Sequence, residues 1–274
     1  AVSVKLKRGR YNVQARKGYY AFPDTDRLPL TAYEAELLEY VSAKSSPTSF
    51  PVNVAGYSFP RRTAAPTAAL FVQFPLAKLR FEKLRDGQTY LAQAEVMLLV
   101  RNSEGSLVHR LSRQYDLQSS QERLTLMRSK DFSFYRRVPL EPGDYSLEAA
   151  VRGRRTGNSS VKKIRFQVPA SDEAPPFLLS SIILSKDSVI TANDASENVF
   201  RLEDPLRFKD ISILPDASGV FRRSQDKELT VFFRATGENP SGQIIAVLEF
   251  SRDGKAGPKF EEALPPADAS GQLQ

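Results

Sequence analysis

Apolar and polar residues alternate through most of residues 50–168, and this period of two constrains the fold more than any other feature. Side chains at that period fall on one face of a β-strand, so each run predicts a strand with one buried face. Seven short runs separated by turn residues are typical of a two-sheet sandwich. We therefore predict an all-β chain with an immunoglobulin- or fibronectin-III-like sandwich at residues 50–168. The residues expected in its core are Val96, Leu98, Phe132, Phe134, Tyr145, Leu147, Val151, Ile164 and Phe166.

The stretch VPLEPGDYSLEAAVRG, residues Val138–Gly153, interrupts an apolar run and then resumes strict alternation. Proline presets its φ angle and glycine accepts a positive one, so Pro142–Gly143–Asp144 predicts a tight corner. We interpret this corner as a β-hairpin within the sandwich. A slip of one residue beyond it would turn Tyr145 and Leu147 toward solvent, so the corner fixes the strand register.

Two shorter elements precede the sandwich. Residues 1–22 alternate on both sides of a glycine-containing turn, which predicts a terminal hairpin left from a preceding domain. Residues 23–49 predict a helical connector, because Thr31 and Glu34 have the spacing of a capping box. The apolar residues that follow share one helical face: Tyr33, Leu37, Leu38, Tyr40 and Val41.

The polar, proline-rich segment 169–176 predicts a domain boundary. Beyond it, residues 177–274 contain strand-like apolar runs but no counterpart of the proline–glycine corner, which predicts a second, incomplete β-rich sandwich. We expect the polar tail after Pro265 to be poorly ordered. We also expect the N-terminal hairpin to pack on the first sandwich or to pair with a neighbouring molecule, since a lone hairpin is marginally stable.

The composition argues against several kinds of chemistry. With no cysteine, the chain has no thiol nucleophile, thiolate metal site or disulfide. Its single histidine, His109, has no catalytic motif beside it, and no phosphate-binding glycine loop or dinucleotide fingerprint occurs. We therefore predict no enzyme activity, no catalytic residues, no cofactor and no metal site. A glycosidase built on carboxylates alone is the enzyme class that the sequence leaves open.

The chain is basic, with 39 Lys and Arg residues against 32 Asp and Glu residues, but these charges are scattered through every segment. The densest basic group lies on one predicted hairpin: Arg152, Arg154, Arg155, Lys162, Lys163 and Arg165. Such a group predicts a patch for an anionic glycan, a lipid headgroup or nucleic acid, of which nucleic acid is the partner we expect least. We favour a simpler interpretation, an edge hairpin guarded by charge against aggregation.

The opening VSVKLKRGRYNVQARKGYYAFP resembles the last hairpin of bacterial von Willebrand factor A-related proteins of the type abundant in acidobacteria. Two motifs carry the resemblance, a basic K-V-K-R-x-G pair and A-R-x-G-Y-Y-A. The matching residues are Lys5, Lys7, Arg8 and Gly9, then Ala15, Arg16, Gly18, Tyr19, Tyr20 and Ala21. The helix, the F-P-V strand and the V-P-L-x-P-G-x-Y corner are similar to the region that follows in that family.

The metal-binding Asp-x-Ser-x-Ser loop of the A-type domain does not occur in this chain. The resemblance therefore implies the part of such a protein that is C-terminal to the A-type domain, in an extracytoplasmic location. Taken together, these features predict a non-catalytic structural or interaction module of a secreted or cell-envelope protein, which binds a partner protein or a neighbouring domain of the same polypeptide. The alternative is a carbohydrate-binding or carbohydrate-active sandwich. No apolar run approaches the ~18 residues of a membrane span.

Overall fold

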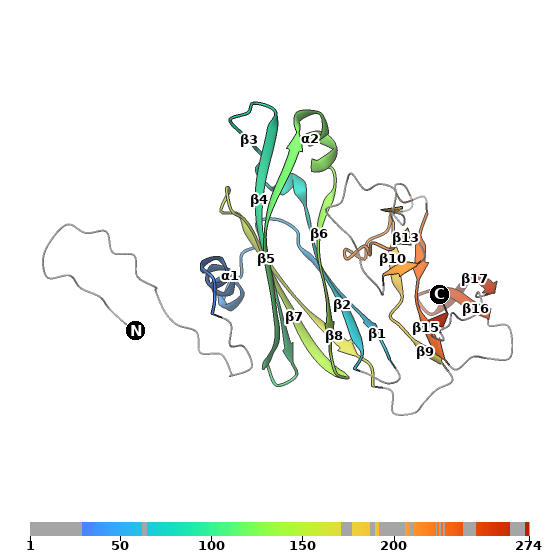
Figure 1. The fold of residues 1–274 in the computed structure, drawn as a ribbon. Helices are drawn as coiled ribbons and strands as arrows, with labels where there is room; N and C mark the ends of the chain where they lie inside the picture. The colour runs from blue at the N-terminus through green and yellow to red at the C-terminus, as the bar shows by residue number, and fades with distance from the viewer. Residues whose placement is uncertain are drawn as a thin grey trace, which may run out of the picture.

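Figure 1 shows the computed structural model of the chain. It describes residues 29–61, 65–170, 177–186, 190–191, 206–208, 211–222, 224, 226, 228–237, 245–263 and 272–273. The hairpin predicted at residues 1–22 and most of the tail after Pro265 lie outside the described residues.

Seven strands form the predicted two-sheet sandwich, and all of their pairings are antiparallel. One sheet has the order β1-β2-β6, from β1 (Asn53–Phe59), β2 (Thr67–Pro75) and β6 (Asp131–Pro139). The other contains β4 (Thr89–Asn102), β5 (Leu107–Ser120), β7 (Gly143–Gly153) and β8 (Ser159–Val168), with the short β3 (Glu82–Lys83) beside the start of β4. This order corresponds to strands A-B-E facing C′-C-F-G of an immunoglobulin-like sandwich. The all-β prediction is confirmed.

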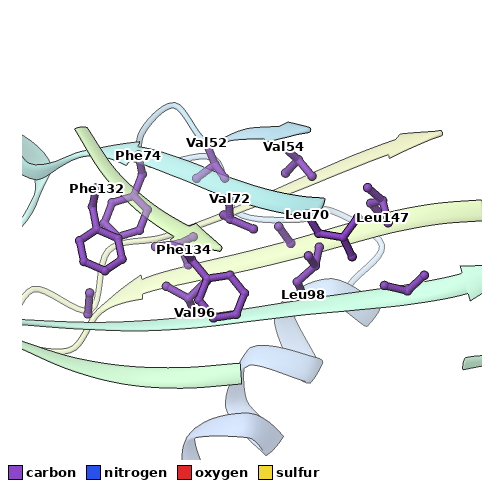
Figure 2. Close-up of a cluster of buried hydrophobic side chains, with 14 of the residues drawn as sticks. Val52, Val54, Leu70, Val72, Phe74, Val96, Leu98, Phe132, Phe134 and Leu147 are labelled. Atoms are coloured by element: carbon purple, nitrogen blue, oxygen red, sulfur yellow. The ribbon is translucent and has the colours of Figure 1, made fainter. Parts of the chain in front are cut away.

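The core of the sandwich lies between the two sheets (Figure 2). Of the nine residues predicted there, eight are buried, and Ile164 is half-buried. Ile164 lies opposite Leu147 on the inner face, but β8 is an edge strand, so one side of the residue stays open. On β1, Gly56 lets the Phe166 ring approach closely, since a Cβ atom there would be 2.7 Å from the ring.

The corner at residues 142–144 is a crossover between sheets, and its interpretation as a hairpin is wrong. β6 pairs with β2 in one sheet, whereas β7 pairs with β4 and β8 in the other. The Tyr145 hydroxyl donates a hydrogen bond of 2.8 Å to the Glu141 carbonyl, the arrangement called a tyrosine corner. Gly143 has a positive φ of 154°, which suits glycine. The predicted register beyond the corner is correct, because Tyr145 and Leu147 are buried.

Helix α1 (Ala32–Ser42) covers the outer face of the β4-β7-β8 sheet (Figure 1). The Glu34 carboxylate accepts hydrogen bonds of 2.8 Å from the Thr31 backbone N–H and from the Thr31 hydroxyl, which confirms the predicted capping pair. The buried apolar face of the helix packs on the outer side chains of β4 and β7. The residues in this contact are Leu37, Leu38, Val41, Met97, Leu99 and Ala150.

A second helix, α2 (Gln121–Arg128), connects β5 to β6; the sequence predicted only the helix within residues 23–49. None of its side chains is fully buried, although Leu124 and Met127 pack against the sandwich core. Its charges suit the helix dipole, with Glu122 in the first turn and Arg128 in the last. A short 3-10 turn, η1 (Leu76–Lys78), follows β2.

The described residues from 177 onward, here the C-terminal region, form four small sheets instead of two facing ones. Three are built from strands of two or three residues: β9 (Phe177–Leu179) with β15 (Ala235–Gly237) and β18 (Gln272–Leu273); β10 (Ile183–Ser185) with β14 (Thr230–Phe232); and β11 (Ile190–Thr191) with β13 (Ile211–Ser212) and β12 (Arg207–Phe208). The fourth is the longer hairpin of β16 (Ile245–Arg252) and β17 (Lys255–Ala263).

The C-terminal region packs on the outer face of the β1-β2-β6 sheet, so it is joined to the first sandwich by a shared apolar cluster. The buried members of that cluster are Phe59, Ala69, Phe71, Ile183, Leu206, Ile213 and Phe232. Gln73 of β2 adds a polar connection, because its side-chain amide donates to the Pro215 carbonyl at 2.7 Å and accepts from the Ala217 N–H at 2.7 Å. Strand β2 is therefore buried on both faces.

Candidate interaction surfaces

The predicted basic group lies on the β7–β8 hairpin, and acidic side chains neutralise half of it. Arg152 contacts both Glu95 and Glu36, with 2.6 Å to the Glu95 carboxylate. Arg155 lies 2.5 Å from the Glu82 carboxylate. Lys163 lies 3.6 Å from Glu148, which also contacts Arg101. These ion pairs reduce the positive potential that the sequence predicted for this hairpin.

The β7–β8 register also distributes these six residues over different surfaces. Arg152, Lys163 and Arg165 lie on the outer face of the sheet, whereas Lys162 lies opposite Ala149 on the inner face. Arg154 is exposed in the connection between the strands, next to Arg155. The residues therefore form one group in the sequence and several small groups on the molecule. An anion-binding patch at this hairpin stays a prediction.

Arg152 has a structural role at the outer face of the sheet. The Glu95 side chain is only 2% exposed there, and it accepts hydrogen bonds from Arg152 at 2.7 Å and from Gln114 at 2.8 Å. Burial, followed by the nearby charge of Arg154, lowers the pKa of the Arg152 guanidinium. A buried carboxylate needs such partners, because an uncompensated buried charge is strongly destabilising.

The single histidine, His109, lies on the inner face of β5, opposite Val100. Its Nε2 atom is 3.1 Å from the Pro139 carbonyl of β6, so a main-chain oxygen is its hydrogen-bond partner. Within the described ranges, no three His, Asp or Glu side chains come close enough together to hold a metal ion.

A group that the sequence analysis missed lies where the edges of β5 and β6 meet. It consists of Arg113 and Tyr115 on β5, and of Phe134 and Arg136 on β6; we call it the β5–β6 opening. The Arg113 guanidinium lies 5.4 Å from the centre of the Tyr115 ring, and that of Arg136 lies 4.5 Å from the Phe134 ring. Arg113 and Arg136 are 23 positions apart along the chain, so only the fold places them in one group.

The β16–β17 hairpin exposes large apolar side chains on both of its faces. Ile245 and Val247 lie on one face, and Phe250 and Phe260 pack edge to face with ring centres 5.9 Å apart. These four side chains are 42% to 57% exposed. No other strand of the described residues pairs with either strand of the hairpin. The turn is tight, because Asp253 and Gly254 both have positive φ angles, of 52° and 75°.

Comparisons with known proteins give no family for this chain. No family model and no curated protein sequence matches it. Among solved structures, a β-glucuronidase of Bacteroides uniformis is 12% identical over 47% of this chain, with a TM-score of 0.27. A β-glucuronidase 2 of the same organism, covalently bound to cyclophellitol-6-carboxylate aziridine, is 13% identical over 42% of this chain, with a TM-score of 0.25. In both cases the match takes in 13% of the enzyme's length.

These similarities are too weak to assign a fold or an activity to this chain. Within the part of the chain that the structure describes, no helix has the length and apolarity needed to cross a bilayer.

Proposed function

We propose that this chain is a non-catalytic interaction module of a secreted or cell-envelope protein, and that the β16–β17 hairpin contacts its partner. The partner is another protein or a neighbouring domain of the same polypeptide. The resemblance to von Willebrand factor A-related proteins supports the location. The exposed apolar hairpin carries the proposal of protein contact.

Exposed apolar side chains on both faces of a two-stranded ribbon are unfavourable in an isolated module. A lone hairpin is marginal in water, and burying each large apolar side chain contributes about 1.5–3 kcal/mol. Contiguous exposed apolar surface is typical of protein interfaces. A partner that covers Ile245 and Val247, or Phe250 and Phe260, would stabilise the hairpin and gain binding free energy from the same surface.

The test compares amide hydrogen exchange of the isolated chain with that of the same chain in complexes purified from its native organism. We expect fast exchange at residues 245–263 in the isolated chain and clear protection in the complex. The double variant Ile245→Thr/Val247→Thr keeps β-branched side chains but removes apolar area, so it should weaken the complex. Leu126→Gln is the matched control, because Leu126 is equally exposed on α2. Equal exchange of the hairpin in both samples would contradict the proposal.

The alternative, carbohydrate binding, gives a different result in a glycan array and a glycosidase screen. Binding that Phe250→Ala or Phe260→Ala abolishes would place a sugar on the exposed rings instead of a protein. Hydrolysis of any glycoside would overturn the non-catalytic assignment.

A further inference from the structure

We propose a second contact site: the β5–β6 opening binds an extended acidic peptide segment, whose carboxylates are held by Arg113 and Arg136. This inference rests on the proposed function as a protein-interaction module, and it names the chemistry of one partner surface.

The opening lies along one side of the sandwich, where an edge strand of each sheet is available. In the part of the chain that the structure describes, β5 pairs only with β4, and β6 pairs only with β2. His109 contacts Pro139 at one end of the opening, and the Tyr115 ring lies 4.6 Å from the Phe132 ring at the other. Arg113 and Arg136 come between these two contacts along their strands.

Both arginines are held in place by aromatic rings. Besides its position over Phe134, Arg136 donates a hydrogen bond of 2.7 Å to the Tyr135 carbonyl. Both guanidinium groups act on the Tyr115 phenol: burial raises the pKa of Tyr115, and the charges of Arg136 and Arg113 oppose that rise. The positively charged guanidinium groups of Arg113 and Arg136 therefore both lie near the Tyr115 phenol, in the β5–β6 opening.

Neither arginine forms an ion pair with a carboxylate of the described residues, unlike most other arginines on the sandwich sheets. Arg101, Arg110 and Arg152 on these strands each have a carboxylate within 4 Å. A guanidinium group can bind a carboxylate through two parallel N–H donors, and here each guanidinium lies over an aromatic ring. An anion is therefore the ligand that fits this pair of charges.

The free strand edges favour a peptide over other anions. Edge strands present unpaired N–H and C=O groups, and an added extended strand satisfies them. β5 is 14 residues long, so it offers several such groups next to Arg113. Inward-pointing charges on edge strands normally prevent strand addition. The same charges become attractive when the added strand is acidic, so this pair of arginines selects its partner by charge.

The experiment uses a labelled ten-residue peptide in which valine and glutamate alternate, with fluorescence anisotropy as the readout. We expect binding that weakens steeply with salt, and no binding of the matched glutamine or lysine peptides. The double variant Arg113→Gln/Arg136→Gln should bind at least tenfold more weakly, whereas Arg154→Gln/Arg155→Gln should bind as the parent does. This control removes the same charge from the connection between β7 and β8. Thermal unfolding of both variants checks that they are folded.

Three outcomes would overturn the proposal. If the control variant loses as much affinity as the test variant, the attraction is general electrostatics. If the glutamine peptide binds equally well, the arginines are irrelevant. If a uronic-acid oligosaccharide displaces the peptide and no amide of β5 or β6 becomes protected from exchange, the ligand is a glycan. The hairpin variants Ile245→Thr/Val247→Thr should leave peptide binding unchanged, so failure here is distinguishable from failure of the proposed function.

Discussion

The first sandwich and the C-terminal region are both built from β-strands, but they are stabilised in different ways. The sandwich has strands of up to 14 residues that enclose their own apolar core. Apart from the β16–β17 hairpin, the strands of the C-terminal region have two or three residues, and their largest buried cluster includes Phe59, Ala69 and Phe71 of the sandwich. The C-terminal region therefore depends on the sandwich, whereas the sandwich core does not depend on it.

The largest effect is expected from a change inside the sandwich core. Phe134 is fully buried between the sheets. Phe134→Ala should lower the free energy of unfolding by about 3–5 kcal/mol, because it removes apolar contacts and leaves a cavity. Chemical denaturation should show one transition at lower denaturant concentration, in which both regions unfold together. If the C-terminal region of this variant stayed folded at denaturant concentrations that unfold the sandwich, the proposed dependence would be wrong.

Phe71→Ala changes the outer face of the same sheet and should separate the two regions. The Phe71 side chain packs against the C-terminal region and lies 5.0 Å from the Tyr135 ring. We expect a loss of about 3 kcal/mol. Hydrogen exchange should accelerate in β10 and β14, whereas the central strands β4 and β7 should remain protected. Uniform acceleration in all four strands would show that the two regions are a single cooperative unit.

Gln73→Ala should have a smaller effect on the same interface. The Gln73 amide bonds to Pro215, Ala217 and, at 2.9 Å, to the Ser133 hydroxyl. Removing it leaves buried backbone groups without partners, which costs about 1–3 kcal/mol. Gln93→Ala is the matched control: Gln93 makes an exposed hydrogen bond to Asp116 of 2.8 Å, and its loss should cost less than about 0.5 kcal/mol. Equal stability losses for the two variants would contradict the role given to Gln73.

The smallest effect expected is a pH dependence of the stability of the C-terminal region. Burial alone would raise the pKa of the Asp216 carboxyl, but Lys186 at 2.5 Å and Ser218 together lower it below its ordinary 3.8. Asp216 therefore adds stability above pH 3.8, and this is lost as the pH falls through the lower folded-state value. We expect the loss to be on the order of 1 kcal/mol, because the pair is partly exposed.

The pKa shift of Asp131 has the opposite sign, since burial and then the charge of Asp216 raise the pKa of its carboxyl. The acid effect of Asp216 must therefore be isolated with Asp216→Asn. Amide hydrogen exchange in β10 and β14, measured from pH 6 to pH 3, should still depend on acid in Asp131→Asn. This acid dependence should be absent in Asp216→Asn. The reverse result would assign the pH dependence to Asp131.

The strands of the sandwich could be predicted from the sequence because each carries its own alternation or turn signal. The sequence also indicates that the outer faces of both sheets are covered, since the continuous apolar runs of β2 and β4 are typical of strands buried on both faces. The alternation at residues 177–274 indicated that strands are present there, but it did not indicate which strands pair with one another. The nature of the corner before Tyr145 could not be predicted, because turn chemistry does not say which sheet the next strand joins.

The candidate sites followed the same division between local and non-local information. The basic hairpin was visible because its charges are close together in the sequence, and the fold then paired half of them with distant carboxylates such as Glu82 and Glu95. The β5–β6 opening was missed because Arg113 and Arg136 belong to strands of different sheets, 23 positions apart. The only local signal was the placement of an arginine among the inward-facing positions of each strand, next to an aromatic residue.

The coverage of both outer faces determines how the molecule would respond to pulling. Helix α1 lies on one outer face and the C-terminal region on the other, so the chain enters and leaves the sandwich on opposite sides (Figure 1). Tension applied along the polypeptide would first peel these two outer layers from their sheets. The next contact to meet the force is the pairing of residues 47–49 with β8, where Val161 donates to Pro47 at 2.8 Å and Ser49 donates to Ser159 at 3.0 Å. Under load, the molecule would therefore lengthen in steps before its long strands separate.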